Sequence, residues 1–189
     1  MGRIAGERSI QEVILSGGDP LTLDDAELAA LVSRLADIPH VKRVRLHTRM
    51  PVVIPQRVTQ ELTEWMRGSR LTVLTVVHVN HPAEIDEQVA AALGRLVDAG
   101  VPVLSQSVLL RGVNDRVEVL AGLYDRLATL RVMPYYLHQL DRVAGAAHFE
   151  VPEREGIELV RQLRARLPGY AVPRYVRETV GEPHKRVLA

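Results

Sequence analysis

The chain of 189 residues contains no cysteine. This absence excludes disulfide bonds, thiolate catalysis, zinc–thiolate sites and an iron–sulfur cluster held by the chain's own side chains. The sequence also lacks a signal peptide pattern and any run of about 20 apolar residues that would cross a membrane. Its net charge is only +1, so no polybasic surface favours nucleic acid or membrane as a partner. A cytoplasmic location is therefore the expectation.

Lysine is scarce as well, because only Lys42 and Lys185 are lysines among the 24 Lys and Arg residues. Arginine supplies the charge at every other basic position, so a retained lysine is a candidate for chemistry that arginine cannot perform. An arginine stays protonated, whereas a desolvated lysine can lose its proton and attack a carbonyl carbon. Lys185 lies near the C-terminus in "VGEPHKRVLA", where the alternative interpretation is a solvated charge.

Short apolar segments rich in Val, Leu and Ile recur along the chain, most of them beginning about 30 residues after the previous one. This composition is typical of strands that are buried on both faces. Amphipathic helical patterns with capping and stop signals separate the segments. The expected strands are 12–16, 43–47, 71–77, 101–110, 131–137 and 170–176, and the expected helices are 24–38, 58–68, 82–100, 114–130 and 152–169.

Strands that alternate with helices in this way predict a parallel α/β fold. No G-x-G-x-x-G motif follows the first strand, which argues against a dinucleotide-binding Rossmann fold. Six strand–helix units instead favour part of a barrel, because a closed barrel needs eight strands and usually about 250 residues. No linker or low-complexity segment interrupts the chain, so we expect one domain over 1–189.

Polar and glycine residues gather where the expected strands end, which is where parallel α/β folds carry their chemistry. His78 and His81 follow the third strand as a candidate metal pair. Gln106 lies within the fourth strand, where a buried amide must find hydrogen-bond partners. The other polar segments are "SGGDPL" (16–21), "HTRMP" (47–51), "RGVND" (111–115), "HQLDR" (138–142) and "ETVGEPHK" (178–185).

Each of these features also has a purely structural interpretation. "SGGDP" is either a turn before a helix or a glycine-lined backbone that a polar ligand can approach. The histidines fit structural roles as well as a metal pair, and Asp141 fits a cap of the turn that follows it. A non-catalytic protein that binds a partner stays open, as does a metal-dependent barrel hydrolase with candidate ligands His78, His81, His138 and Asp141.

Several longer segments, taken together, resemble the lysine 2,3-aminomutase family over nearly the whole chain, from about residue 11 to 187. The most specific of them is "MPYYLHQLD" (133–141) followed by "GAAHF" (145–149). Within the family, the segments are most similar to the branch that serves β-lysylation of elongation factor P. The others are "EVILSGGDPL", "HTRMPVVIPQRVT", "HVNHPAEID", "LSQSVLLRGVND" and "PGYAVPRYV" followed by "GEPHK".

The resemblance implies a radical S-adenosylmethionine enzyme that also uses pyridoxal phosphate and moves the α-amino group of L-lysine to the β-carbon. It implies a partial (β/α)6 TIM-like barrel that lacks the first strand and helix units. Lys185 matches the lysine that holds pyridoxal phosphate as a Schiff base, within a cofactor-binding segment 170–189. Asp141 and Glu178 match the acidic pair that receives the substrate's side-chain ammonium. The positions that match contacts to S-adenosylmethionine are Ser16, Gly17, Gly18, Asp19, His78 and Gln106.

The sequence departs from the family pattern at two points. Lysine-specific members usually have aspartate at the second acidic position, and Glu178 fits the elongation factor P branch better. The family holds a 4Fe–4S cluster with a C-x3-C-x2-C motif, for which this chain has no cysteine. We therefore interpret the chain as the C-terminal part of an aminomutase, inactive in the radical reaction by itself. Proteins of the elongation factor P pathway and further copies of the chain are its expected partners.

Overall fold

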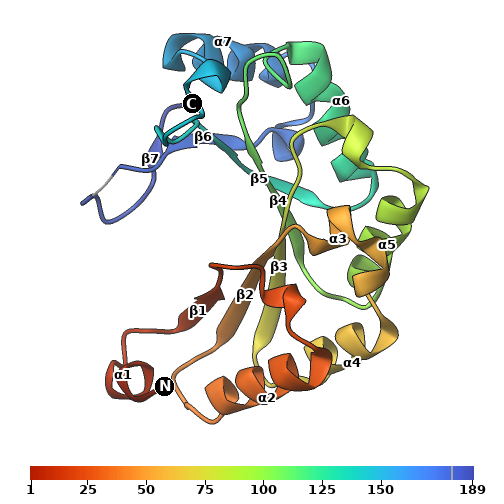
Figure 1. Ribbon diagram of the computed structural model, residues 1–189, viewed down its shortest axis with the longest axis vertical. Coiled ribbons are helices and arrows are strands. Elements are labelled where there is room, and N and C mark those ends of the chain that lie inside the picture. Colours follow the sequence, from red (N-terminus) through yellow and green to blue (C-terminus); the bar gives the residue numbers. More distant parts are fainter. Residues whose placement is uncertain (180) are drawn as a thin grey trace. The chain divides into compact units, whose positions relative to one another are not determined.

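The computed structural model describes residues 1–179 and 181–189. The chain forms two compact units: unit 1 comprises Met1–Val77 and Glu87–Leu104, and unit 2 comprises His78–Asp86 and Ser105–Ala189. Seven strands, β1 to β7, follow one another in the order of the sequence (Figure 1). The α/β character expected from the alternating pattern is confirmed, and the single domain expected over 1–189 stays a prediction.

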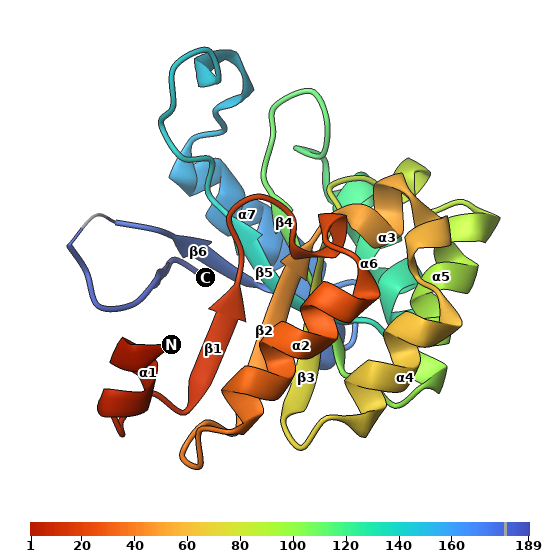
Figure 2. The same ribbon diagram turned by 60° about the horizontal axis from the view of Figure 1, so that its bottom comes forward.

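Unit 1 contains the first three strands and the helical segments that connect them. β1 (Glu12–Leu15) pairs in parallel with β2 (Arg43–Thr48), and β2 pairs in parallel with β3 (Thr72–His78). Helices α2 and α4 pack together and lie on the same side of these strands (Figure 2). The helical segments are α1 (Gly2–Gly6), η1 (Pro20–Thr22), α2 (Asp25–Ala36), α3 (Met50–Val53), η2 (Pro55–Arg57), α4 (Gln60–Gly68) and α5 (Glu87–Asp98).

Unit 2 contains the later strands, including most of β4 (Val103–Val108). β5 (Met133–His138) pairs in parallel with β6 (Arg174–Arg177), and β6 pairs antiparallel with the short strand β7 (Arg186–Val187). The parallel pairing brings the carboxyl ends of β5 and β6 to one edge. The helical segments are η3 (Pro82–Glu84), α6 (Val117–Thr129), η4 (Ala147–Phe149), α7 (Glu153–Arg164) and η5 (Gly169–Ala171).

Helix α2 shows why the amphipathic segments form where the sequence predicts them. The Asp24 carboxylate accepts a hydrogen bond from Glu27 N at 2.7 Å, and the Glu27 carboxylate accepts one from Asp24 N at 3.4 Å. This capping box satisfies donors that the first helical turn leaves unpaired. Leu28, Val32 and Leu35 are buried along one face, and each such side chain contributes about 1.5–3 kcal/mol when it leaves water.

The strands β2 and β4 bury one face only, so the expectation that these strands are buried on both faces is wrong. In β2, buried Val44 and Leu46 alternate with half-buried Arg43 and Arg45. The reason is the period of two along a strand, which turns successive side chains to opposite faces. β4 shows the same alternation, with Gln106 on its less buried face. Arg43, Arg45 and Gln106 therefore lie on the less buried faces, whereas Ser105 and Ser107 lie on the buried face of β4.

The six expected strands and five expected helices are all present, with shifted ends. The expected helix over 82–100 is divided into η3 and α5. The expected helix over 114–130 begins at Val117, so the role of Asn114 as its first residue is wrong. The buried Asn114 amide instead donates to the carbonyl oxygens of Asn80 and Val108, both at 2.9 Å, and its oxygen accepts from Leu110 N.

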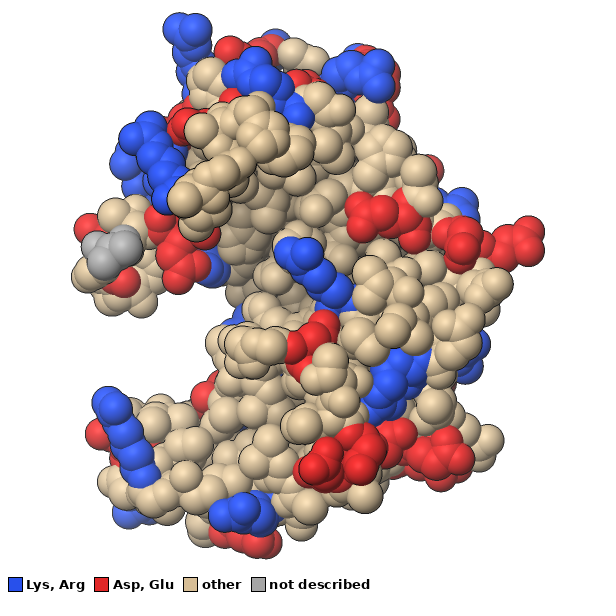
Figure 3. All heavy atoms as spheres, in the orientation of Figure 1, with Lys and Arg blue, Asp and Glu red and all other residues tan. Residues whose placement is uncertain are grey.

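Charged side chains of both signs are interspersed over the face of the molecule in Figure 3. This distribution agrees with the net charge of +1 and the absence of a polybasic segment. Among the described residues, no helix is long and apolar enough to cross a membrane.

Candidate functional site

In unit 1, the "SGGD" segment forms the turn between β1 and η1. Gly17 and Gly18 have φ values of 84° and 59°, in the left-handed region that other residues rarely adopt. No neighbouring atom lies within 4 Å of the position that a Cβ would take at either residue. The glycines are therefore required by the backbone conformation, and the exposed turn leaves room for a ligand to approach.

Asp19 fixes this turn to the end of β2. One carboxylate oxygen, Oδ1, accepts hydrogen bonds from Leu21 N at 3.0 Å and from Thr48 Oγ1 at 2.7 Å. The other, Oδ2, accepts from Arg49 N at 2.6 Å. Both oxygens are thus committed to internal donors, and the carboxylate holds the glycine turn in place. Its direct contact with S-adenosylmethionine stays a prediction.

In unit 2, His78 and Gln106 lie on neighbouring segments. Val79 N donates to the Gln106 carbonyl oxygen at 3.1 Å, and His78 Nε2 lies 3.3 Å from Asn80 Oδ1. The Asn80 oxygen also accepts from Val108 N at 2.8 Å, which ties the segment after β3 to β4. Both predicted cofactor contacts are half-buried, so a ligand can reach them.

His81 has a structural role at the start of η3. Its Nδ1 accepts a hydrogen bond from Ala83 N at 3.1 Å, while the Glu84 carboxylate accepts from His81 N at 2.7 Å. Across 1–179 and 181–189, no group of three or more His, Cys, Asp or Glu side chains is placed to hold a metal ion. The structural interpretation of His81 is thus favoured over the metal pair.

Asp141 and Glu178, which follow β5 and β6, line one cavity of about 400 Å³. They meet because the two strands are parallel neighbours, and the ladder continues past β5 where Gln139 N donates to Val176 O at 2.8 Å. The turn after Asp141 is closed by its main-chain oxygen, which accepts from Val143 N, so its carboxylate does not cap that turn. The cavity is also lined by Leu140, Arg142, Arg177, Thr179 and Arg186.

Lys185 contacts one member of this acidic pair, Glu178. Its Nζ donates a hydrogen bond to Glu178 Oε2, and the two side chains are 30 % and 63 % exposed. This hydrogen bond and the positive charge of Lys185 hold the pKa of Glu178 below its ordinary value. The antiparallel pair Arg177–Arg186 lies directly beside this contact, so β7, which the sequence did not indicate, places Lys185 opposite Glu178.

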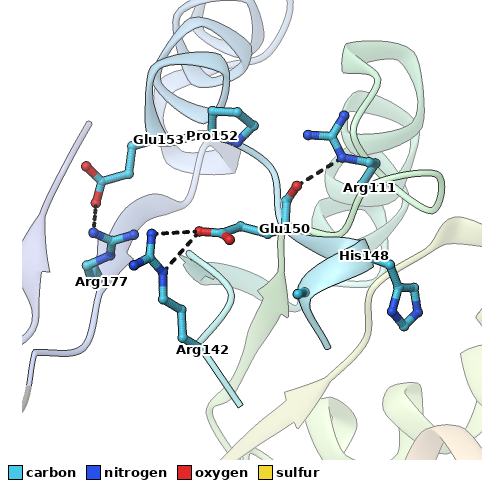
Figure 4. Close-up of a pocket in the computed structure, with 8 residues that line it drawn as sticks. Arg111, Arg142, His148, Glu150, Pro152, Glu153 and Arg177 are labelled. Carbon is cyan, nitrogen blue, oxygen red and sulfur yellow. Dashed lines mark hydrogen bonds and ion pairs between the residues drawn. The ribbon is translucent and has the colours of Figure 1, made fainter. Parts of the chain in front are cut away.

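A second cavity, of about 600 Å³, shares Arg142 and Arg177 with the cavity of the acidic pair, and we call it the basic cavity (Figure 4). Arg177 forms an ion pair with Glu153 at 2.6 Å, whereas the 82 % exposed side chain of Arg142 holds Glu150 loosely, at 3.3 Å. Arg111 Nε donates to the Glu150 carbonyl oxygen at 3.0 Å. Arg142 and Arg177 therefore form a wall shared by the basic cavity and the cavity of the acidic pair.

Two supporting residues behind the acidic pair were missed in the sequence. Gln139 is 2 % exposed, its Nε2 donates to Val151 O at 2.9 Å, and its Oε1 accepts from the Tyr175 hydroxyl. Burial, together with the charge of Glu153, raises the pKa of Tyr175 to about 12. The available signal was an amide between His138 and the apolar Leu140, two positions before Asp141.

Comparisons with known proteins find no matching family model. The L-lysine 2,3-aminomutase of Escherichia coli is 48 % identical over 185 residues, covering 98 % of this chain and 54 % of that protein. The L-lysine 2,3-aminomutase of Haemophilus influenzae is 47 % identical over 186 residues, covering 98 % of this chain and 55 % of that protein. The chain thus spans about half the length of these curated relatives.

Two solved structures share the fold of this chain. A radical SAM methyltransferase from Sphaerobacter thermophilus matches with a TM-score of 0.63 at 20 % identity, covering 94 % of this chain and 54 % of that chain. A domain of pyruvate-formate lyase-activating enzyme from Bacteroides vulgatus matches with a TM-score of 0.60 at 15 % identity, covering 88 % and 98 %. These matches confirm the predicted fold class, a partial TIM-like α/β barrel.

Proposed function

We propose, on the confirmed resemblance of this chain to the lysine 2,3-aminomutase family, that it carries the substrate and pyridoxal phosphate sites of such an enzyme. The reaction moves the α-amino group of L-lysine to the β-carbon. One observation carries the proposal: Asp141 and Glu178 line a single cavity, and Lys185 contacts Glu178. Because the chain spans about half of its relatives, the whole reaction is part of the proposal.

The acidic pair suits the side-chain ammonium of lysine. An ammonium has three N–H donors, and charge-assisted hydrogen bonds to carboxylates are among the stronger ones in proteins. The lowered pKa of Glu178 keeps its carboxylate ionised at neutral pH. In this role Asp141 and Glu178 bind and orient the end of the substrate that does not react.

Lys185, which contacts Glu178, and the arginines that line the cavity fit pyridoxal phosphate. Lys185 supplies the primary amine that binds an aldehyde, which arginine cannot do. Arg142, Arg177 and Arg186 line the cavity and offer the planar guanidinium groups that phosphate prefers. When bound, the cofactor supplies the carrier for the migrating amino group. The protein's own residues bind, orient and shield it.

For S-adenosylmethionine, we propose that the backbone of Ser16, Gly17 and Gly18 and the side chains of His78 and Gln106 make the contacts. Asp19 contributes by holding the glycine turn, because its carboxylate oxygens are committed to Leu21, Thr48 and Arg49. The chain contains no cysteine, so the ligands of a 4Fe–4S cluster come from outside these 189 residues.

The identity of residue 178 also indicates which branch of the family the chain resembles most. We assign the chain to the aminomutases of the elongation factor P pathway because it has glutamate where lysine-specific members usually have aspartate. Free L-lysine is then the substrate, and the proteins that use the β-lysine product are the expected partners.

The proposal is tested by absorbance spectroscopy of the chain mixed with pyridoxal phosphate. We expect the band of a Schiff base in the wild type and in Lys42→Ala, but none in Lys185→Ala. Lys42 is the matched control, because it is the only other lysine. Borohydride reduction followed by peptide mass spectrometry places the label. An unchanged band in Lys185→Ala, or a label at Lys42, would show the assignment to be wrong.

A further inference from the structure

The contact between Lys185 and Glu178 joins two groups that the proposed function assigns to different ligands. Lys185 is the amine for the aldehyde of the cofactor, and Glu178 is a carboxylate for the ammonium of the substrate. In the structure, Lys185 Nζ itself donates to Glu178 Oε2. The side chain of a lysine substrate ends in the same ammonium group as Lys185, so Lys185 occupies part of the site meant for the substrate.

We propose that the Lys185 ammonium takes the place of the substrate ammonium on Glu178 until the cofactor captures Lys185, so that this ion pair opposes binding of the cofactor. Glu178 thereby has two successive roles. Before capture it is a positioning residue that holds Lys185 Nζ, and after capture it is a ligand of the substrate. The inference rests on the proposed function of both residues.

The backbone fixes this contact at the base of a hairpin. The pairs Val176–Val187 and Arg177–Arg186 join β6 and β7 immediately before Glu178 and after Lys185. Two further hydrogen bonds continue the pairing, from Leu188 N to Tyr175 O at 2.8 Å and from Tyr175 N to Ala189 O at 3.0 Å. Tyr175 is fully buried and so anchors the hairpin in the core. The position of Lys185 is therefore set by strand pairing.

Charge explains why Glu178 serves one ammonium at a time. The cavity of the acidic pair contains two carboxylates and three guanidinium groups. While Lys185 is an ammonium, it balances Glu178, and a substrate ammonium would have Asp141 as its only unpaired anion there. Arg142 and Arg177 face carboxylates of the basic cavity, but they still add positive charge beside the site. A second ammonium is thus repelled until Lys185 leaves Glu178.

The capture step is balanced without an oxidant or a reductant. The Lys185 ammonium gives one proton to solvent, and its nitrogen lone pair forms a bond to the aldehyde carbon. The carbonyl oxygen takes up the two protons that remain on the amine and leaves as water, and the nitrogen ends in a carbon–nitrogen double bond. Glu178 stays a carboxylate and loses the hydrogen bond from Lys185 Nζ, so that it can accept one from the substrate ammonium. The phosphate group meanwhile brings negative charge to the cavity, which favours entry of the substrate ammonium.

Three variants test the inference through the affinity for pyridoxal phosphate alone, measured at neutral pH from the absorbance band. In Glu178→Gln the competing ion pair is lost, and we expect binding about two- to fivefold tighter than in the wild type, the range of an exposed ion pair. Asp141→Asn is the matched control, because it removes one negative charge from the same cavity and no contact to Lys185. Glu178 is 63 % exposed, so its substitution does not threaten folding.

The outcomes separate the inference from the proposed function. A gain in Glu178→Gln that exceeds the change in Asp141→Asn supports the inference. Equal changes in the two variants would overturn it, because the effect would then come from the overall charge of the cavity. No gain in Glu178→Gln would also overturn it, because the ion pair would then not compete with the cofactor. Lys185→Ala is the third variant. If it retains the band, the proposed function fails instead, whatever the other two variants show.

Discussion

Gly156 of α7 faces the hydroxyl group and ring of Tyr175 so closely that a Cβ atom at residue 156 would overlap them. A glycine inside a helix usually costs about 0.5–1 kcal/mol relative to alanine. Here the missing side chain makes room for the buried tyrosine that anchors β6. The contact thus connects the packing of α7 to β6, the strand that Glu178 follows.

Gly156→Ala is expected to destabilise the protein by about 1–3 kcal/mol, because the added methyl group must displace a buried aromatic ring. The measurement is the free energy of unfolding in urea. Gly122→Ala in α6 is the control, since no heavy atom lies within 4 Å of its Cβ position. There the helix gains propensity and stability stays equal or rises. A Gly156→Ala protein as stable as the Gly122→Ala protein would contradict the packing described above.

Tyr175→Phe is expected to cost about 1–3 kcal/mol at neutral pH, because Gln139 Oε1 loses its donor in a buried position. The pKa of Tyr175 is about 12 in the folded protein and about 10 in an unfolded chain. Its neutral hydroxyl therefore stabilises the fold below about pH 10, and that stability is lost as the pH rises toward 12.

Urea unfolding at a series of alkaline pH values tests this sign. The wild type should lose up to about 1.4 kcal/mol per pH unit more than Tyr175→Phe above pH 10. The pKa of buried Tyr124 is raised as well, by burial, but that residue is present in both proteins and cancels in the comparison. Parallel pH profiles of the two proteins would show that Tyr175 titrates as an ordinary tyrosine.

Asp19→Asn is expected to destabilise the protein by about 1–3 kcal/mol, because an amide offers one acceptor oxygen where the carboxylate offers two. Of Leu21 N, Thr48 Oγ1 and Arg49 N, at least one then loses its acceptor. Thermal unfolding is the measurement. Asp37→Asn is the control, since this aspartate is exposed and its side chain has no hydrogen bond or ion pair within the described residues. Equal stability of the two variants would refute the role given to Asp19.

Reconstitution of the chain with iron and sulfide is expected to yield no 4Fe–4S cluster. The reason is chemical, because these clusters are held by cysteine thiolates and the chain has none. Electron paramagnetic resonance after reduction is the measurement. A stoichiometric 4Fe–4S signal from these 189 residues would show that other side chains hold a cluster. The proposal that the cluster ligands come from outside these residues would then be wrong.

The strands were predictable from sequence because a run of Val, Leu and Ile has few alternatives to burial. The two-residue strand β7 was not, since Arg186 and Val187 form no apolar run and the pairing depends on the distant β6. The polar face of β2 was visible in Arg43 and Arg45. The apolar composition of a segment does not reveal such a face, because only the alternation of polar and apolar residues along the strand indicates it.

The sequence was sufficient to predict the position of the acidic pair, but not the side-chain contacts around the predicted sites. Asp141 and Glu178 each follow an expected strand, so the parallel fold was sufficient to bring them to one edge. The contacts of Gln139 with Tyr175 and of Asp19 with Thr48 depend on rotamers and register, which spacing does not determine. The cap at His81 was obscure for another reason, since histidine is not among the usual capping residues.

The register of the pairing between β6 and β7 determines which residue faces Glu178. Successive residues of a strand point to opposite faces, so a slip of β7 by one position would turn Lys185 away and present His184 or Arg186 instead. Neither of these can replace a primary amine. The two backbone pairs between β6 and β7 therefore determine whether Lys185 faces Glu178, where it can react with a cofactor, or points away as an ordinary surface charge.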